Sequence, residues 1–283
     1  MVNGAQSVFV EKNGVLEKIS AEFFDELHLM RVINQIVAQV GRRIDESSPL
    51  VDARLADGSR VNAIIPPLSL SGATLTIRKF PENPFQMTDL IEKNMLNTDM
   101  FAYLKTAVES QKNIIISGGT GTGKTSLLNA LANLIPPHER IVTIEDSAEI
   151  NINHEHVVSL ESRPANIENT GAISIRMLLK NSLRMRPDRI VVGEIRGGEA
   201  IDMLQAMNTG HKGSLTTVHA NAPLETLYRL ETMVLMGDVN LPIQAIRPQI
   251  IQAIDIVLQI SRASNGQRRI TSVSKILKDD FNG

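Results

Sequence analysis

The sequence predicts an α/β fold in which a domain with a parallel-sheet core follows a small α+β domain. The first observation is length, because 283 residues suffice for two domains. The second is an alternation of apolar β-like runs with helical patterns from residue 113 onward, which is typical of a parallel sheet covered by helices. The third is the different order before residue 80, ββαβββ, which indicates a separate α+β unit.

The elements of the first domain follow from turn residues and periodicity. Two β-like runs open the chain, at 7–11 and 15–19. They flank Asn13-Gly14, a dipeptide that tolerates the positive φ angles of a hairpin turn. After Ser20, the expected N-cap, apolar residues recur at steps of three and four up to Gly41, which predicts one amphipathic helix. Three more strands are predicted, at 51–55, 60–65 and 73–78.

A proline-containing segment is expected to separate the domains. Residues 80–85 include two prolines, which break both helical and strand periodicity. We therefore expect the small domain over 1–80, a linker over 81–87 and the second domain over 88–283. The second domain is expected to contain strands at 113–117, 140–144, 189–193, 214–218 and 254–260, and helices that include 177–183 and 224–235.

Composition excludes several classes of function. Lys and Arg total 29 against 31 Asp and Glu, so there is no basic excess for a nucleic-acid backbone. Tryptophan is absent and only two tyrosines occur, so rings for base stacking are few and direct nucleic-acid binding is not expected. The absence of cysteine excludes disulfides and thiolate zinc sites and fits the cytosol. No run approaches the roughly 20 apolar residues of a transmembrane segment, so membrane association is expected to require a partner.

The segment after residue 113 has the order strand, GxxxxGK[ST], helix. Glycines in such a loop let backbone amides turn inward around a phosphate, and the helix N-terminus adds its positive dipole end. A chance glycine-rich turn is the alternative, but the motif lies in the structural context that phosphate binding requires. We expect Lys124 to reach the β- and γ-phosphates and the Thr125 hydroxyl to bind Mg²⁺. The expected nucleotide-binding residues are Gly118, Gly119, Thr120, Gly121, Thr122, Gly123, Lys124, Thr125 and Ser126.

Acidic residues follow two other predicted strands. Glu194 comes directly after the apolar run 189–193, and Glu145 and Asp146 come after 141–144. Because parallel strands end at the same edge of a sheet, these carboxylates can converge where Mg²⁺ and an attacking water are held. Acids at strand ends can also be solvated loop residues, but the P-loop favours a catalytic role. No guanine-reading NKxD motif occurs, which favours ATP as the nucleotide.

Histidines offer one further candidate. His219 and Thr217 lie at the end of the run 210–221 and are candidates to sense the γ-phosphate. His154 and His156 have a spacing that a metal site can use, but a surface or structural role is the expected one for them.

Four blocks in this order resemble the motifs of the secretion ATPase superfamily of type II secretion, type IV pili and type IV secretion. They are the Walker A motif at 118–125, the Asp box IEDSAE at 144–149, the Walker B block RMRPDRIVVGEIRGGEA at 184–200 and the His box GHKGSLTTVHAN at 210–221. Within that superfamily, residues 41–68 and the sequence LTIRKF at 75–80 resemble the CpaF/TadA branch, which powers tight-adherence (Flp) pili.

The resemblance implies roles for single residues. Glu145 resembles the acid that polarises the attacking water, with support from Asp146, which joins Thr125 and Glu194 as an expected metal-site residue. Glu194 resembles the Walker B acid on Mg²⁺, and His219 resembles the residue near the γ-phosphate. Arginines of the small domain reach the nucleotide in this family, and the matching residues here are Arg60, Arg78 and Arg54. Surface charges on strands are the alternative for these arginines.

The resemblance also implies an architecture and an assembly. The expected molecule is a RecA-like P-loop ATPase domain preceded by a PAS-like domain, with ATP and Mg²⁺ as cofactors. It would work as a homo-hexamer, peripheral to the cytoplasmic face of the inner membrane, acting on platform proteins and through them on a pilin or secreted protein. Open alternatives are a ring ATPase of type IV secretion or DNA transfer, a nucleotide-gated assembly module without turnover and, least favoured, a small-molecule kinase.

Overall fold

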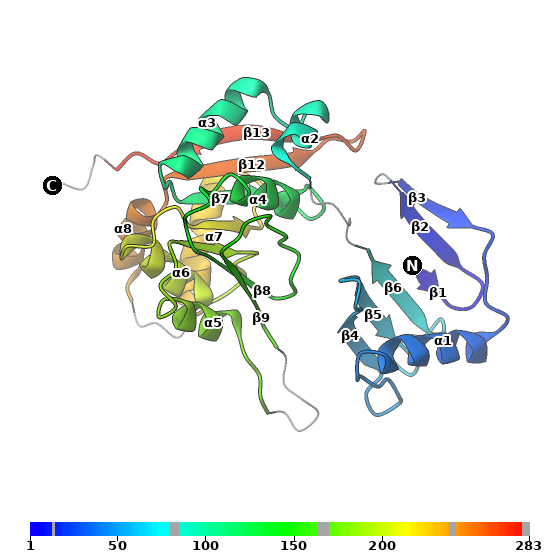
Figure 1. Cartoon of the computed structure of the whole chain (residues 1–283). Helices are drawn as coiled ribbons and strands as arrows, with labels where there is room; N and C mark the ends of the chain where they lie inside the picture. The colour runs from blue at the N-terminus through cyan, green and yellow to red at the C-terminus, as the bar shows by residue number, and fades with distance from the viewer. Residues whose placement is uncertain (13–14, 80–84, 164–169, 238–240, 279–283) are drawn as a thin grey trace. The chain divides into compact units, whose positions relative to one another are not determined.

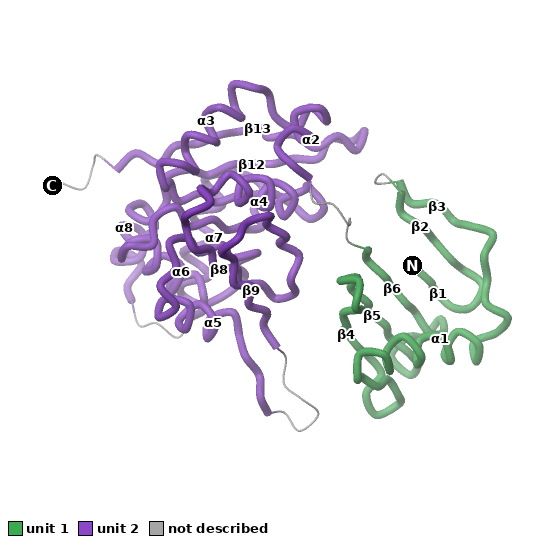
Figure 2. Tube along the Cα trace, viewed as in Figure 1, with its two compact units in different colours: residues 1–82 green, residues 83–283 purple. Residues whose placement is uncertain are grey.

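A computed structural model of the chain describes residues 1–12, 15–79, 85–163, 170–237 and 241–278. The chain divides into two compact units, Met1–Glu82 and Asn83–Gly283 (Figure 2). Each unit is described by itself below. The turn predicted at Asn13-Gly14 and residues 81–84 of the expected linker lie outside the described residues.

The first unit is one helix against a six-stranded antiparallel sheet with the strand order β3-β2-β1-β6-β5-β4 (Figure 1). Its elements are β1 (Val2–Asn3), β2 (Val8–Lys12), β3 (Val15–Ile19), α1 (Glu26–Ala38), β4 (Leu50–Arg54), β5 (Arg60–Ile64) and β6 (Thr74–Arg78). Leu29, Ile33 and Val37 form one buried stripe of α1 and join the core with strand residues such as Val61 and Leu75. The prediction of a small α+β unit is confirmed, with β1 as an additional two-residue strand between β2 and β6.

The predicted start of α1 is wrong. The N-cap is Asp25, whose carboxylate accepts a hydrogen bond of 2.6 Å from the backbone amide of His28. Ser20 cannot fill this role because the backbone of the following residues is not helical: the amide of Phe23 donates to the carbonyl of Ala5 at 2.8 Å. The apolar periodicity extends before the helix because Phe23 also packs on the core of this unit.

The second unit contains a seven-stranded sheet with the order β13-β12-β7-β11-β10-β8-β9. Its strands are β7 (Ile114–Gly118), β8 (Ile141–Glu145), β9 (Val157–Glu161), β10 (Arg189–Val192), β11 (Leu215–Val218), β12 (Ile256–Arg262) and β13 (Arg268–Lys275). All neighbours run parallel except β12 and β13, which form an antiparallel hairpin. The predicted parallel-sheet core is confirmed, and β9 and β13 are strands that the sequence analysis missed.

Helices cover both faces of this sheet (Figure 1). They are α2 (Met87–Glu92), α3 (Thr98–Glu109), α4 (Lys124–Ala132), α5 (Ile175–Ser182), α6 (Glu199–Asn208), α7 (Pro223–Leu235) and α8 (Ile243–Ala253). Strand β7 shows the layering: Ile114 and Ile116 join the cluster of α2, α3 and α4, whereas Ile115 joins the cluster of α5 to α8. With both faces covered, polar side chains of the inner strands collect where the strands end.

Register brings the ends of the inner strands together. Ser117 of β7 pairs with Val218 of β11, and Val192 of β10 pairs with Ile144 of β8. The residues that follow these strands therefore meet at one edge of the sheet. Among the described helices, none combines the length and the apolar character needed to cross a membrane.

Candidate functional site

The loop between β7 and α4 has a conformation that only glycine permits at three positions. Gly121 and Gly123 have φ angles of +71° and +97°, in the left-handed region that side chains disfavour. Gly118 has a different constraint, because a Cβ there would lie 2.7 Å from the carbonyl oxygen of Ile260. The loop therefore presents bare backbone at the start of a helix, which is the arrangement that receives phosphate.

Lys124 places its ammonium group over this loop. Its Nζ donates to the carbonyl oxygens of Gly118 at 2.9 Å and Gly119 at 3.0 Å, and it lies 3.1 Å from Nε2 of His219. Burial lowers the pKa of Lys124, and the nearby carboxylate of Glu194 opposes that shift. A cation held over this loop suits a phosphate group as its counterion.

Glu194, directly after Gly193 at the end of β10, is surrounded by nitrogen atoms. The guanidinium of Arg196 donates to Oε2 of Glu194 from Nη2 at 2.7 Å and from Nε at 2.9 Å. Nε2 of His219 lies 2.8 Å from Oε1. Oε1 is buried, yet within the described part of the chain it accepts no hydrogen bond of good geometry. The sequence-predicted residues Lys124, Glu194 and His219 thus form one cluster, and Arg196 is a fourth member that the sequence analysis missed.

Electrostatics in this cluster set the charge of each group. The hydrogen bond with Glu194 raises the pKa of Arg196. Burial lowers the pKa of His219, against the opposing effect of Glu194, so the imidazole is neutral at neutral pH. The cluster therefore holds two cations and one carboxylate around a neutral ring.

The protein groups of this cluster could supply only some of the ligands of a magnesium ion. Glu194 offers a carboxylate oxygen without a hydrogen-bond donor of good geometry, and Mg²⁺ prefers such hard oxygen ligands. Asp146 lies near this cluster, since its Oδ2 is 3.7 Å from Nη1 of Arg196. The side chain of Asp146 is 63% exposed, and its carboxylate also accepts a hydrogen bond from the hydroxyl of Ser162. Thr125 lies in the first turn of α4. Among the described residues there is no group of three or more His, Cys, Asp or Glu that could hold a metal ion.

Glu145 lies at the end of β8 and is bound by main-chain amides. Its Oε1 accepts from the amide of Glu149 at 2.8 Å and of Ile150 at 3.0 Å. The side chain is buried against Gly193, where a Cβ would lie 3.0 Å from Cγ of Glu145. Glu145 and Glu194 thus follow or end adjacent strands, β8 and β10, but Glu145 is held by main-chain amides and Glu194 by the side chains of Arg196 and His219.

Other histidines and Thr217 have structural partners. Thr217 donates its hydroxyl to the carbonyl of Gly193 at 2.8 Å, so it ties β11 to β10. His154 lies 3.0 Å from the carbonyl of Pro136, and His156 lies 2.6 Å from a guanidinium nitrogen of Arg140. These contacts agree with the structural role expected for both histidines.

The three predicted arginines of the first unit occupy one row. Arg54 pairs with Arg60 across β4 and β5, and Arg60 pairs with Arg78 across β5 and β6. They alternate with the buried residues Val61 and Leu75, so they lie on the sheet face opposite α1. The structure thus brings the three predicted arginines together on one face of the sheet of the first unit.

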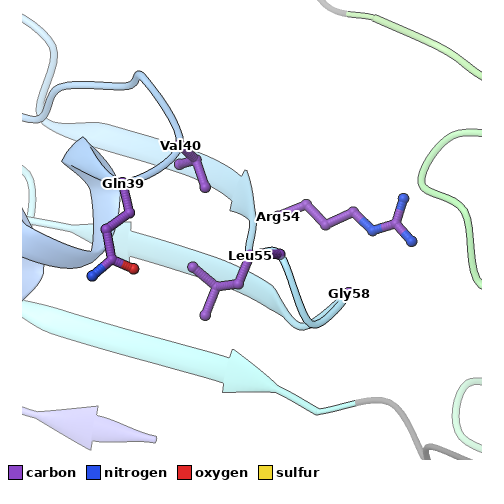
Figure 3. A pocket seen from close by; sticks show the side chains of 6 residues that line it. Gln39, Val40, Arg54, Leu55 and Gly58 are labelled. Atoms are coloured by element: carbon purple, nitrogen blue, oxygen red, sulfur yellow. The ribbon is translucent and has the colours of Figure 1, made fainter.

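A surface hollow of the first unit lies between the end of α1 and the turn after β4. It is lined by Gln39, Val40, Arg54, Leu55, Ala56 and Gly58. Figure 3 shows the side chain of Arg54, the charged member of this set, extended away from Gln39 and Leu55.

Comparisons with known proteins agree with the motifs. The family model described as "Type II/IV secretion system protein" matches residues 1–279. A putative conjugal transfer protein of Mycobacterium tuberculosis is 35% identical over 280 residues, which cover 97% of this chain and 79% of that protein. The type IV secretion system protein PtlH of Bordetella pertussis is 36% identical over 271 residues, with 86% and 79% covered.

Solved structures show the same fold. The VirB11 ATPase of the Brucella suis type IV secretion system aligns with a TM-score of 0.57 at 29% identity, over 97% of this chain and 90% of that one. The pilus retraction motor PilT aligns with a TM-score of 0.68 over 98% and 78%, and at 19% identity it speaks for the fold alone. The predicted RecA-like class is therefore confirmed, as is the resemblance to the secretion ATPase superfamily. The chain belongs to the type II/IV secretion system protein family.

Proposed function

We propose that this protein is a MgATP-hydrolysing motor of a type IV (Flp/Tad) pilus or a type II/IV secretion system. The observation that carries the proposal is the cluster of Lys124, Glu194 and His219 beside a P-loop whose glycines are sterically required. A P-loop alone indicates nucleotide binding. The added acids at the ends of β8 and β10 supply what turnover requires.

The roles follow the geometry of the second unit. The backbone of residues 118–126 and the ammonium of Lys124 bind the phosphates, and Thr125 and Glu194 hold the metal with Asp146 beside them. Mg²⁺, when bound, would neutralise charge on the phosphates. Glu145 polarises the attacking water, and its two main-chain donors fix its orientation.

His219 and the arginine row complete the proposed site. The neutral imidazole of His219 lies between Lys124 and Glu194 and reports the state of the γ-phosphate to β11. Arg60 and Arg78 act across the domain boundary and stabilise charge that develops on the phosphoryl group, as arginine fingers do. We place the domains at 1–80, PAS-like, and 88–283, joined by a linker over 81–87.

The proposed assembly is a homo-hexamer, located in the cytoplasm and peripheral at the inner membrane. Its direct partners would be platform proteins of the secretion or pilus machine, and a pilin or secreted protein would be moved indirectly, without direct contact with nucleic acid. The sequence blocks at 41–68 and 75–80 support the CpaF/TadA assignment.

A second candidate is a ring ATPase of type IV secretion or DNA transfer. It is favoured by the relatives named as a conjugal transfer protein and as a type IV secretion system protein. Both candidates use the same chemistry, so only complementation separates them: the gene should restore either piliation or conjugation in a host that lacks the corresponding ATPase.

Steady-state ATP hydrolysis tests the enzyme itself. The wild-type protein should hydrolyse ATP in the presence of Mg²⁺, with Lys124→Ala as the inactive comparison. Tight nucleotide binding without turnover, at protein concentrations that support hexamers, would replace the motor by a nucleotide-gated assembly module. Absence of nucleotide binding would reject both.

A further inference from the structure

Three polar side chains lie inside the apolar layer between the sheet and α7. Ser117 of β7 and Thr226 of α7 are 0% exposed, and Gln259 of β12 is 4% exposed. Ser117 and Gln259 are direct partners in the parallel register of β7 and β12, so their side chains share one face of the sheet. It is the face on which Ile115 packs against α5 to α8. Polar groups buried in such a layer are unfavourable for folding unless they are hydrogen-bonded, so their partners are informative.

The carbonyl of Ala220 is the point at which these side chains meet the end of β11. It accepts a hydrogen bond from Oγ of Ser117 at 3.4 Å and from Nε2 of Gln259 at 3.3 Å. Behind them, the hydroxyl of Thr226 donates to Oγ of Ser117 at 2.8 Å. Ala220 directly follows His219, so side chains of β7 and β12 hold the peptide next to that ring.

These contacts close a ring of bonds through the lysine of the P-loop. Ser117 directly precedes Gly118, whose carbonyl accepts from Nζ of Lys124 at 2.9 Å. The same ammonium lies 3.1 Å from Nε2 of His219. From His219 the backbone leads to Ala220, whose carbonyl accepts from Ser117. The lysine therefore contacts the ring of His219, while Ser117 holds its backbone.

The two hydroxyl groups form a directed chain. Each hydroxyl has a single proton to donate. The hydroxyl of Thr226 lies nearer to Oγ of Ser117, at 2.8 Å, than to the carbonyl of Ala222, at 3.1 Å. With Thr226 as its donor, Ser117 directs its own proton to the carbonyl of Ala220. Polarisation along such a chain strengthens the last bond. Thr226 thus orients Ser117, and Ser117 holds Ala220.

Gln259 is an unfavourable residue for stability at its position. Its Nε2 donates to the carbonyl of Ala220, but its Oε1 is buried and accepts no hydrogen bond from the part of the chain that the structure describes. Leucine, which is of similar size, would occupy this apolar layer without an unsatisfied acceptor. The amide costs stability while its donor holds the peptide after His219, and this combination indicates a positioning role.

We propose that Ser117, Thr226 and Gln259 are positioning residues for hydrolysis, which hold the carbonyl of Ala220 and thereby keep the imidazole of His219 in place. The inference rests on the proposed function and adds to it the residues that set where His219 lies. They act through the main chain of residues 219–220. Small displacements of groups in a reacting site cost much of the rate, so loss of these bonds lowers turnover while nucleotide binding is retained.

Two variants remove the polar groups with little change in size. Gln259→Leu and Thr226→Val should each lower kcat for ATP hydrolysis about tenfold and leave the ADP affinity, measured by calorimetry, within about twofold of wild type. Gln259→Leu should not lower the melting temperature, because it also removes the unsatisfied acceptor. Thr226→Ser keeps the hydroxyl and should restore kcat to within about twofold of wild type.

The imidazole itself gives a readout that does not need turnover. In nucleotide-free protein, the Cε1–Hε1 NMR resonance of His219, assigned by its absence in His219→Ala, should shift in Gln259→Leu and in Thr226→Val. Thr216→Val is the matched control. The Thr216 hydroxyl is buried on the same sheet face, two residues before Val218, and has no hydrogen-bond partner among the described residues. Its removal should leave kcat and the His219 resonance unchanged.

Any of four results would overturn the proposal. Unchanged kcat, with the His219 resonance unmoved or shifted, would mean that the network does not serve hydrolysis. A loss of ADP affinity equal to the loss of kcat would make it a support of the P-loop. A lower melting temperature in Gln259→Leu would make the amide a structural group. An equal loss of kcat in Thr226→Ser and Thr226→Val would exclude the hydroxyl chain. If wild type hydrolyses no ATP, the proposed function fails, and the His219 resonance still decides whether the network holds the ring.

Discussion

The ends of β8 and β10 lie side by side, and each carries a glutamate, but the two carboxylates are held in different ways. Glu145 is 3% exposed, and the amides of Glu149 and Ile150 donate to it. The carboxylate of Glu194 is contacted by two side chains, the guanidinium of Arg196 and the ring of His219.

This difference decides which of the two carboxylates can exchange its hydrogen-bond partners. Main-chain donors cannot leave unless the loop after β8 refolds, so the orientation of the Glu145 carboxylate is fixed. Side-chain cations leave by a change of rotamer, and Arg196 is 62% exposed at its side chain. Glu194 is therefore the acid whose ion-pair partner can leave, as its proposed role at a metal site requires.

The largest expected effect concerns Lys124, the lysine near Glu194. Lys124→Ala should lower ATP affinity on the order of 100-fold or more and abolish turnover, because the variant loses the ammonium that, in the proposed site, contacts two phosphates. Calorimetry and a phosphate-release assay measure both quantities. The control is Lys105→Ala, an exposed lysine of α3 that pairs with Glu109. Wild-type hydrolysis in Lys124→Ala would reject the P-loop assignment.

In the arginine row of the first unit, by contrast, Arg60 lies opposite Arg54 and Arg78. Arg60→Ala and Arg78→Ala should depress turnover by about 10³-fold or more, with much smaller effects on ATP affinity, as expected for arginine fingers. Unfolding free energy should change by about 0.5 kcal/mol or less. Arg31→Ala, an exposed arginine of α1 on the other side of the sheet, is the control. Unchanged hydrolysis in both variants would mean that these arginines are surface charges without a catalytic role.

The two glutamates themselves give the sharpest contrast. Glu145→Gln and Glu194→Gln should both lose about 10²- to 10⁴-fold in turnover while ATP affinity is retained. Only Glu145→Gln should also lower the unfolding free energy, by about 1–3 kcal/mol, because the new NH₂ group cannot accept from the loop amides. Urea unfolding of both variants measures this. Equal stability would contradict the proposed difference between fixed and exchangeable partners.

The smallest expected effect concerns Arg196, the ion-pair partner that must leave Glu194 before a metal ion can bind. Arg196→Ala should lower the Mg²⁺ concentration that half-saturates nucleotide binding by up to about fivefold, because the ion no longer competes with an exposed ion pair for Glu194. Magnesium titration of a fluorescent ADP analogue measures it. Arg184→Ala, an exposed arginine in the segment before β10, is the control. A higher Mg²⁺ requirement in Arg196→Ala would mean that Arg196 assists the metal site instead of blocking it.

The sequence by itself determined the features that depend on short stretches. Apolar runs predicted the inner strands β7, β8, β10 and β11, and the spacing of glycines and Lys124 predicted the P-loop, because each of these patterns is local. Their positions at the ends of predicted strands, supported by the family motifs, indicated Glu194 and His219, which lie together in the structure. The edge strands β9 and β13 were missed because they are partly exposed and lack a continuous apolar run.

Only the tertiary structure decided which groups meet. The start of α1 moved from Ser20 to Asp25 because the amide of Phe23 binds the distant carbonyl of Ala5. Contacts between residues far apart in the chain are likewise absent from any local pattern. The approach of Arg262 to Gly121 joins positions that only the parallel pairing of β7 and β12 brings together.

The two glutamates show the physical reason most directly. The sequence shows each as an acid after an apolar strand, and this pattern is the same for both. Their difference depends on donors: a loop that folds back over Glu145, and side chains from two strand ends that converge on Glu194. Strand ends and residue types are determined by local sequence, whereas hydrogen-bond partners are determined by the packing of the sheet.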